Sequence, residues 1–410
     1  MPTTLKDEAA IVGIGQTEFS KNSGRSELQL ASEAVKEALE DAGLRPGDVD
    51  GMTTFTLDST DEIELARSVG IGDLTFFSRI PHGGGAAIGV VHQAVMAIAT
   101  GSAEVVVCYR ALNGRSGQRY SSGVSEGPTT SDAIHWSWYM PWGLMTPASW
   151  VAMFTMRYMH EYGARSADLA QVAISTRKHA VHNPNAFFYG QPLTLEDHQS
   201  SRMIVEPFHL YDCCQETDGG CACILTTPER ARDLHQPGAL IRSVAQAAGS
   251  HQEVMTSFYR PSISHLPEFD LVAKQIYEIS GLSPDDVDAA VIYDAFTSIV
   301  MWQLESFGFC ERGEASDFIK DGNLEAGGRL PCNTHGGQLS EAYIHGMNGV
   351  NEGVRLIRGT STNQPEKNDC VLVTGGVGVP TSGMILGKMD QPVRRARGKG
   401  RRQSPPSKVH

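Results

Sequence analysis

An eight-residue segment that occurs twice constrains the fold more than any other feature of this sequence. Residues 43–50 (GLRPGDVD) are followed 238 positions later by residues 281–288 (GLSPDDVD). Each copy has a glycine suited to the end of a helix and a proline-started turn, and each leads into an apolar stretch. Because similar segments this far apart are typical of a duplicated fold, the sequence predicts two similar halves.

The segments around each copy occur in the same order. A helical stretch precedes the copy and a short apolar strand follows it, and each half also has a glycine-rich turn, a helix and another strand. Strands are expected at residues 9–15, 51–55, 105–108, 289–293 and 371–374, and helices at 27–42, within 82–101, at 269–280 and within 336–359. Apolar strands that alternate with helices favour an α/β fold with parallel sheets covered on both faces.

Residues 115 to 206 interrupt this alternation and are interpreted as an inserted loop and substrate subdomain. After a Ser/Gly/Thr-rich start, the insertion is rich in aromatic residues: Trp136, Trp138, Tyr139, Trp142, Trp150 and Phe154. These rings favour either the wall of an apolar ligand channel or a packed core or dimer contact. We divide the chain into a first half (1–114, completed by 207–236), the insertion (115–206), a second half (237–389) and a tail (390–410).

Charge and hydropathy argue against several classes of function. The formal net charge is -13, and the only basic run, residues 394–402, lies in the Pro/Ser/Gly-rich tail, which is predicted to be disordered. Nucleic-acid binding is therefore not expected. The N-terminus lacks the layout of a signal peptide, and no stretch of about 18 uncharged apolar residues could span a bilayer. We expect a cytoplasmic protein that does not bind membranes.

The eight cysteines of this long chain fit buried, reduced thiols rather than a disulfide framework. Four of them, Cys213, Cys214, Cys221 and Cys223, lie close enough in sequence to suggest a zinc site. Adjacent and alternate cysteines, however, do not match the paired spacing of common structural zinc sites. Small apolar residues packed on a strand and its turn explain them better, so no metal is expected.

Residues 333–346 (NTHGGQLSEAYIHG) have the composition of a reaction site. Two adjacent glycines allow a tight turn and a close approach of the backbone. Six polar or titratable side chains accompany them: Thr334, His335, Ser340, Glu341, Tyr343 and His345.

These features together resemble the thiolase superfamily, in its branch of sterol-carrier-protein-type thiolases and lipid-transfer-protein-like relatives. The resemblance extends from about Ala9 to Met389, and its most specific part is the ordered series at residues 179–186, 201–207, 212–214 and 218–220. It implies a thiolase fold with duplicated halves in five αβαβα layers and an inserted loop subdomain. It also implies a homodimer and acyl-CoA substrates.

The chain departs from the thiolase pattern at each catalytic position. His82 stands where a thiolase has its nucleophilic cysteine, and Leu372 stands at the position of the second cysteine. Tyr293 replaces the asparagine of the Asn-Glu-Ala-Phe motif, and Tyr343 replaces the histidine of the Gly-His-Pro motif. The enolate site is therefore predicted to contain two phenols and no catalytic thiol.

A thiolase-like site without its cysteine cannot carry an acyl group, so the second fragment must leave as a free ketone or aldehyde. This is a retro-aldol cleavage of a β-hydroxyacyl-CoA, which needs a base, an acid and a stabilised enolate. Tyr293 is proposed as the base and Tyr343 as the acid, in either order, provided that hydrogen bonds or cations lower the pKa of one phenol. The candidates for hydrogen bonding to the thioester oxygen or for supporting the site are His82, His335, His345, Asn333 and the backbone of residues 374–378, including Gly376 and Gly378.

The same departures resemble the steroid side-chain aldolases of bacterial sterol catabolism. That resemblance implies a steroid 17-hydroxy-20-carboxyl-CoA substrate, cleaved to a 17-ketosteroid and propionyl-CoA, with CoA as part of the substrate and no covalently bound cofactor. It also implies a hydratase subunit with a zinc-ribbon/OB-fold domain as a partner chain.

Several alternatives remain open at this point. A 3-ketoacyl-CoA thiolase shares the fold but needs a thiol nucleophile. A non-catalytic acyl-CoA or lipid-binding protein would also explain the lost cysteines. Schiff-base and metal-dependent aldolases are weaker options, because neither motif contains a lysine and the sequence shows no good metal cluster.

Overall fold

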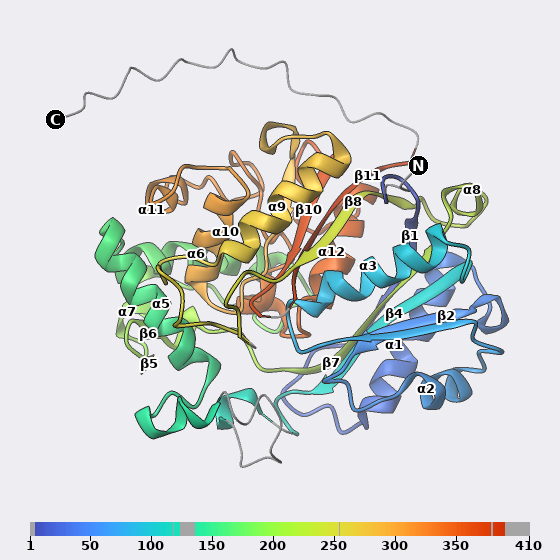
Figure 1. Ribbon diagram of the computed structural model, residues 1–410, viewed down its shortest axis with the longest axis horizontal. Helices are drawn as coiled ribbons and strands as arrows, with labels where there is room; N and C mark the ends of the chain where they lie inside the picture. Colours follow the sequence, from blue (N-terminus) through green and yellow to red (C-terminus); the bar gives the residue numbers. More distant parts are fainter. Residues whose placement is uncertain (1–4, 118, 124–135, 254, 379, 390–410) are drawn as a thin grey trace.

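The computed structural model describes residues 5–117, 119–123, 136–253, 255–378 and 380–389. The predicted tail, 390–410, lies outside these residues, as does part of the Ser/Gly/Thr-rich start of the insertion. Figure 1 shows strands near the centre with helices packed around them. None of the helices within the described residues combines the length and apolarity needed to cross a bilayer.

Nine strands form one sheet in the order β3-β2-β4-β7-β1-β8-β11-β10-β9, and β5 pairs with β6 in a separate hairpin. The strands are β1 (Ala10–Gln16), β2 (Gly51–Phe55), β3 (Phe76–Ile80), β4 (Val105–Asn113), β5 (Met203–Val205), β6 (Phe208–His209), β7 (Asp218–Thr226), β8 (Ala239–Ala247), β9 (Ala289–Val291), β10 (Cys370–Gly375) and β11 (Thr381–Lys388). The helices are α1 (Glu27–Ala42), α2 (Glu62–Val69), α3 (Ala86–Ala99), α5 (Pro147–Tyr162), α6 (Ser166–His182), α7 (Leu195–Ser200), α8 (Pro228–Ala231), α9 (Pro267–Ser280), α10 (Thr297–Ser306), α11 (Ala315–Phe318) and α12 (Met347–Arg358).

The repeated segment of the sequence has the same structure in both places. Helices α1 and α9 end at Gly43 and Gly281, whose φ angles of 70° and 73° are left-handed, and a short 3-10 turn follows each glycine. The Asp50 carboxylate accepts hydrogen bonds from the backbone N–H groups at the start of β4, and the Asp288 carboxylate does the same for β10. The prediction of duplicated halves is therefore confirmed, while the exact domain boundaries stay a prediction.

Two central helices lie between the halves of the sheet. Helices α3 and α12 contact strands of both halves, whereas α1 packs on β1, β4 and β7 and α9 packs on β8 and β11. Val91 of α3 and Val354 of α12 are fully buried in one core cluster, which also contains strand residues of both halves. The resulting order of layers is the expected αβαβα, and the layered α/β fold is confirmed.

The strand directions correct one expectation, because the sheet is mixed rather than parallel. Strands β2, β3 and β4 are mutually parallel, as are β9 and β10. Strand β7, however, lies antiparallel between β4 and β1, and β11 lies antiparallel between β8 and β10. Helical crossovers separate the parallel strands in sequence, whereas β7 follows the insertion and β11 follows β10 through a short turn.

The insertion packs against the second half, where α5, α6 and α7 lie together on one side of Figure 1, coloured green. The Phe154 ring of α5 lies 6.3 Å from the Trp302 ring of α10, and both side chains belong to one buried cluster. Trp138 and Trp142, in contrast, are 67% and 82% exposed. The aromatic residues of the insertion therefore divide between core and surface, and some line the cavity described next.

Candidate active site

A cavity of about 1620 Å³ is lined by residues from both halves and from the insertion. Its apolar lining includes Trp136, Met145, Trp150, Phe296, Ile299 and Val377. Its polar lining includes Lys21, Arg110, Asn113, Arg115, Arg119 and Glu216. Of the two arrangements expected for the aromatic insertion, Trp136 and Trp150 fit a channel wall, whereas Phe154 fits a packed core. The cavity is large enough for a ligand with a rigid apolar part and a long polar part.

Tyr293 and Tyr343 both line this cavity, and their phenol oxygens lie 3.4 Å apart. Tyr293 directly follows β9 and Ile292; its backbone N–H donates to Thr374 Oγ1 on β10 (3.0 Å), and its carbonyl accepts from Gln303 Nε2 on α10 (2.8 Å). The backbone N–H of Tyr343 donates to Thr217 Oγ1 next to β7 (2.9 Å). Elements of both halves therefore bring the two predicted phenols together.

The protonation of the two phenols differs from the expectation. Burial raises the pKa of both Tyr293 and Tyr343 above the ordinary tyrosine value of about 10. The hydrogen bond between them opposes this rise in the pKa of Tyr293 but adds to the rise in the pKa of Tyr343. The condition that one phenol pKa be lowered is therefore not met, because loss of contact with water has the largest effect on both phenols. Both phenols are therefore neutral at neutral pH.

The glycine turn before α3 allows Tyr293 to reach its position. A Cβ atom at Gly84 would lie only 2.0 Å from Tyr293 Oη, so the phenol lies directly against bare backbone. His82, at the position of the thiolase cysteine, also lines the cavity and has a φ of 62°. Left-handed backbone at a residue other than glycine costs about 1–3 kcal/mol and is concentrated at functional sites.

His345 lines the same cavity, and its two ring nitrogens have different neighbours. Arg110 Nε lies 3.1 Å from His345 Nδ1, and the Tyr343 ring packs edge-on against the imidazole at 5.0 Å. A Cβ atom at Gly83 would lie 3.2 Å from His345 Nε2, which places that nitrogen at the glycine turn. Burial, with Arg110 adding to it, lowers the pKa of His345 well below its ordinary value. The imidazole is therefore neutral.

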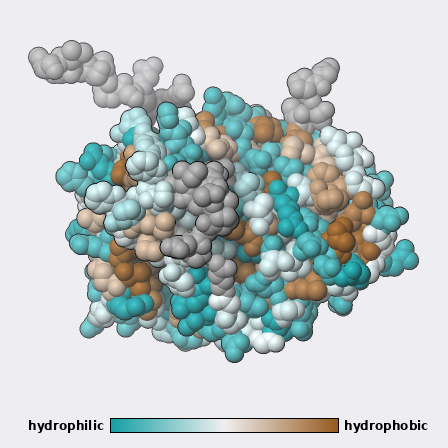
Figure 2. Space-filling model, turned by 60° about the horizontal axis from the view of Figure 1, so that its bottom comes forward, coloured by the Kyte–Doolittle hydropathy of each residue, from teal (hydrophilic) through white to brown (hydrophobic). Residues whose placement is uncertain are grey.

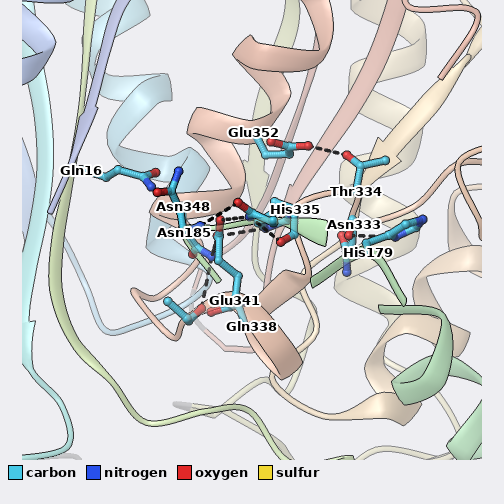
Figure 3. Close-up of polar contacts among 12 residues, drawn as sticks. Gln16, His179, Asn185, Asn333, Thr334, His335, Gln338, Glu341, Asn348 and Glu352 are labelled. Carbon is cyan, nitrogen blue, oxygen red and sulfur yellow. Dashed lines mark hydrogen bonds and ion pairs between the residues drawn. The ribbon is translucent and has the colours of Figure 1, made fainter. Parts of the chain in front are cut away.

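Asn333 and His335 do not line the cavity but belong to a buried polar network (Figure 3). The Asn333 side chain bonds the N–H and the carbonyl of Ile292, at 2.8 and 2.9 Å, and thereby supports the backbone before Tyr293. His335 Nε2 lies 3.8 Å from Glu341 Oε2, and burial lowers the pKa of His335 to about 3. Of the two roles considered for His335, support of the site therefore fits the structure better than a direct hydrogen bond to a thioester oxygen.

Gly376 and Gly378 lie beside the cavity rather than on its surface. Val377, between them, is the residue of this turn that lines it. The Gly378 carbonyl accepts from Gln252 Nε2 at 2.8 Å, so this turn is tied to the loop after β8. The structure fits a supporting role for these two glycines better than direct contact with the ligand.

Glu341 is the carboxyl group at the centre of the buried network in Figure 3. Its two oxygens accept hydrogen bonds from Asn183 Nδ2 and Asn348 Nδ2, both at 2.9 Å. Burial raises the pKa of Glu341 to about 8, from an ordinary value of about 4.3. A carboxyl whose pKa is raised by folding stabilises the fold below its unfolded pKa, and this contribution is lost as the pH rises through the folded pKa.

We predict that Glu341→Gln will reduce the loss of stability between about pH 5 and pH 8. The amide cannot ionise, so the free energy of unfolding should fall less across this range, by an amount on the order of a few kcal/mol. Urea unfolding at several pH values measures the difference. The exposed Glu196→Gln is the matched control and should follow the wild type. Identical pH dependence in wild type and Glu341→Gln would contradict the buried protonated carboxyl.

The four clustered cysteines separate into two pairs. Cys213 and Cys214 line the cavity, whereas Cys221 and Cys223 are buried on β7. Burial raises the pKa of both cavity thiols, which keeps them protonated. In the described parts of the chain, no group of three or more His, Cys, Asp or Glu side chains is placed to hold a metal ion.

Three residues of the site were not identified from the sequence. Arg110 sits in the middle of β4 without a local motif, and Lys21 lies in an irregular segment. Gly84 was recognised only as part of a glycine-rich turn. A charged residue inside an otherwise apolar strand, as in residues 105–112, was the one signal that could have pointed to Arg110.

Comparison with known proteins gives the class of the fold. Residues 9–227 match the model described as Thiolase, N-terminal domain, and residues 249–388 match the model described as Thiolase C-terminal domain-like. The chain therefore belongs to the thiolase family.

Two similar relatives are named for cleavage of a steroid side chain and of a pregnene carboxyl-CoA. The chain is 62% identical to the steroid side-chain-cleaving aldolase of Thermomonospora curvata, over 94% of this chain and 99% of that one. It is 57% identical to the 17-hydroxy-3-oxo-4-pregnene-20-carboxyl-CoA lyase of Mycobacterium tuberculosis, over 93% and 100% of the two chains. The solved structure of the Ltp2-ChsH2(DUF35) aldolase matches with a TM-score of 0.91 at 62% identity, covering 95% of this chain and 100% of that one.

Proposed function

We propose that this protein is a carbon-carbon lyase that cleaves a β-hydroxyacyl-CoA by a retro-aldol reaction. The proposed substrate is a steroid 17-hydroxy-20-carboxyl-CoA, which yields a 17-ketosteroid and propionyl-CoA in cholesterol side-chain degradation. The main observation in support of this reaction is that the phenol oxygens of Tyr293 and Tyr343 lie 3.4 Å apart on the cavity wall. High identity over nearly the full length of two named relatives supports the same substrate class.

The cavity lining fits both parts of such a substrate. Trp136, Trp150 and Ile299 offer apolar surface to a ring system. Lys21 and Arg115 carry the charge opposite to that of CoA phosphates. Burial lowers the pKa of Lys21 to about 8, and its ammonium donates to the Gln215 side chain and the Glu216 carbonyl, both at 2.7 Å. An acyl-CoA with a rigid apolar acyl group therefore complements the cavity.

Two neutral phenols can carry the proton through the reaction without a resting tyrosinate. The β-hydroxyl gives its proton to Tyr293 as its oxygen becomes a carbonyl and the Cα–Cβ bond breaks. The electron pair of that bond moves to the thioester enolate. Tyr293 passes its own proton to Tyr343, and Tyr343 protonates Cα, so one proton moves from oxygen to carbon and neither water nor CoA is consumed. The order agrees with the hydrogen bond between the phenols, in which the Tyr293 hydroxyl donates to the Tyr343 oxygen.

A turnover assay tests the substrate class directly. The protein, with and without a ChsH2(DUF35)-type partner, is given a 17-hydroxy steroid acyl-CoA and, separately, a 3-ketoacyl-CoA of the same ring system. Mass spectrometry follows ketone and acyl-CoA products. The proposal predicts turnover of the hydroxy compound alone. Turnover of the ketoacyl-CoA alone, or of neither compound under both conditions, would contradict it.

The thiolase alternative would require a cavity cysteine to act as a nucleophile. Cys214 lines the cavity, but burial raises its pKa well above the ordinary value, so little thiolate forms. We predict that Cys214→Ser will change kcat less than about threefold, whereas loss of a covalent nucleophile costs many orders of magnitude. A Cys214→Ser protein that folds but is inactive would favour a thiol mechanism.

We also propose that the protein forms a homodimer through the free edge of β3. This strand ends the sheet, and Phe77 on it is 60% exposed. On the face shown in Figure 2, hydrophobic residues occur in separate patches among polar ones, so apolar surface is limited.

We predict that Phe77→Glu will shift the protein from dimer to monomer, because a buried charge opposes association. Light scattering after gel filtration measures the mass. Leu271→Glu on α9, 41% exposed in the wild type, is the matched control and should remain a dimer. A Phe77→Glu protein that keeps the wild-type mass would place the interface elsewhere.

A second chain is proposed as a heteropartner. A similar solved structure is named for an Ltp2 and a ChsH2(DUF35) component. We propose that this chain binds a partner of that kind, the zinc-ribbon/OB-fold domain of a hydratase subunit. Co-purification of the two expressed chains tests the complex, and failure to associate would oppose it. A cytoplasmic location stays a prediction, to be checked by cell fractionation.

A further inference from the structure

A buried ion pair lies directly behind one of the cavity histidines. Arg110 and Asp58 are 2% and 5% exposed, and Arg110 Nη1 lies 2.9 Å from Asp58 Oδ2. The Asp58 carboxylate also accepts from the backbone N–H groups of Thr60 (2.9 Å) and Ala111 (3.1 Å). The two backbone N–H groups therefore fix the Asp58 carboxylate, and the carboxylate fixes the Arg110 guanidinium.

The contact between Arg110 and His345 determines which ring nitrogen of His345 carries the proton. Arg110 Nε lies 3.1 Å from His345 Nδ1, and a guanidinium nitrogen only donates hydrogen bonds. Nδ1 must therefore accept, and a neutral imidazole that accepts at Nδ1 carries its hydrogen on Nε2. The Nδ1–H tautomer and the imidazolium would each set two N–H groups against each other.

The protonated nitrogen faces the reaction site. His345 lines the cavity, and its Nε2 lies near Gly83, next to the Gly84 backbone against which the Tyr293 phenol packs. The aromatic rings of Phe55, Tyr120 and Tyr343 surround the imidazole at centroid distances of 6.1, 5.0 and 5.0 Å. A neutral Nε2–H here is a fixed hydrogen-bond donor, the kind of group that stabilises a developing thioester enolate oxygen.

We propose that Asp58 and Arg110 are positioning residues that lock His345 in the Nε2–H tautomer, so that it always presents a donor to the thioester oxygen. The catalytic part of this inference depends on the proposed retro-aldol function, but the tautomer does not. The wrong tautomer would present a lone pair to a negatively charged oxygen. In catalytic sites, a buried group that hydrogen-bonds one ring nitrogen of a histidine commonly decides which nitrogen carries the proton.

The test variant removes the lock without leaving a buried charge. In Asp58→Asn/Arg110→Gln, the amide of residue 110 can either donate to Nδ1 or accept from it, so both tautomers become possible. The matched control neutralises another buried pair, Arg260 and Glu268, whose atoms lie 2.9 Å apart and which does not line the cavity. That control is Arg260→Gln/Glu268→Gln.

Solid-state 15N NMR of histidine-labelled protein reports the tautomer, with the His345 signals assigned by their loss in His345→Gln. We expect Nε2–H alone in the wild type and the control, and a mixture in Asp58→Asn/Arg110→Gln. For the same variant we expect kcat to fall by roughly 10–100-fold with KM nearly unchanged, less than the ~10²–10³-fold cost of losing a donor outright.

The two proposals fail in different ways. An Nδ1–H or doubly protonated His345 in the wild type overturns the lock, and this measurement is decisive even if the double variant does not fold. An unchanged tautomer, or an unchanged kcat, in a folded double variant also overturns it. A locked tautomer in a protein without aldolase activity would instead overturn the proposed function.

Discussion

Replacing Tyr343 by Phe should lower turnover of the acyl-CoA substrate by roughly 10²–10⁴-fold, the range for loss of a general acid. The phenol oxygen of Tyr343 lies 3.4 Å from that of Tyr293 in the cavity, and it is the group proposed to protonate Cα. The ring remains, so packing against His345 is retained, and the lost hydrogen bond costs only about 1 kcal/mol of stability. Steady-state kinetics and substrate binding by calorimetry measure the two effects separately.

The matched control is Tyr189→Phe, because Tyr189 is 55% exposed and does not line the cavity. It should retain wild-type kinetics. Substrate should bind to Tyr343→Phe within a few-fold of the wild-type affinity. If Tyr343→Phe turned over substrate within about threefold of the wild type, the paired-phenol mechanism would be wrong. If the wild type bound acyl-CoA without turning it over, the non-catalytic alternative would gain support.

The second large effect is expected for Gly84→Ala. The added Cβ would lie 2.0 Å from both Oη and Cζ of Tyr293, far inside van der Waals contact, so the phenol must move. Overpacking of this kind costs about 1–3 kcal/mol of stability, and misplacement of a reacting group by about 1 Å can cost roughly 10²-fold in rate. We expect a folded protein with a lower melting temperature and at least that loss of kcat.

Gly72→Ala is the matched control, since no atom lies within 4 Å of a Cβ at that position. The double variant Gly84→Ala/Tyr293→Phe adds a sharper test. If Gly84 acts only through the Tyr293 phenol, adding Gly84→Ala to Tyr293→Phe should lower kcat little further. Fully multiplicative losses would show that Gly84 serves the site in another way.

The sequence was sufficient for the features that depend on local chemistry. The two copies of the glycine, proline and aspartate turn predicted the duplication, because each turn has the same cap and the same carboxylate contacts with a neighbouring strand. Tyr293 and Tyr343 were identified because they replace residues of motifs whose positions are defined by the family. The catalytic roles assigned to them stay predictions until they are measured.

Other features depend on how deeply a side chain is buried and on which way it points, and neither can be read from the sequence. The polar stretch at residues 333–346 suggested that His335 and His345 face one site, but the turn of residues 337–341 separates them, and only His345 lines the cavity. The proposed mechanism called for hydrogen bonds or cations to lower the pKa of one phenol, but burial raises the pKa of both. Arg110 could not be assigned, because its partners Asp58 and His345 are far apart in the chain.

The requirement for free CoA tests the central claim most directly. The protein is incubated with its partner and a 17-hydroxy steroid acyl-CoA in buffer from which free CoA has been removed enzymatically, and products are quantified by mass spectrometry. The paired-phenol account predicts ketosteroid and propionyl-CoA in equal amounts, at a rate that added CoA does not increase. Cleavage that begins only when CoA is added would contradict it.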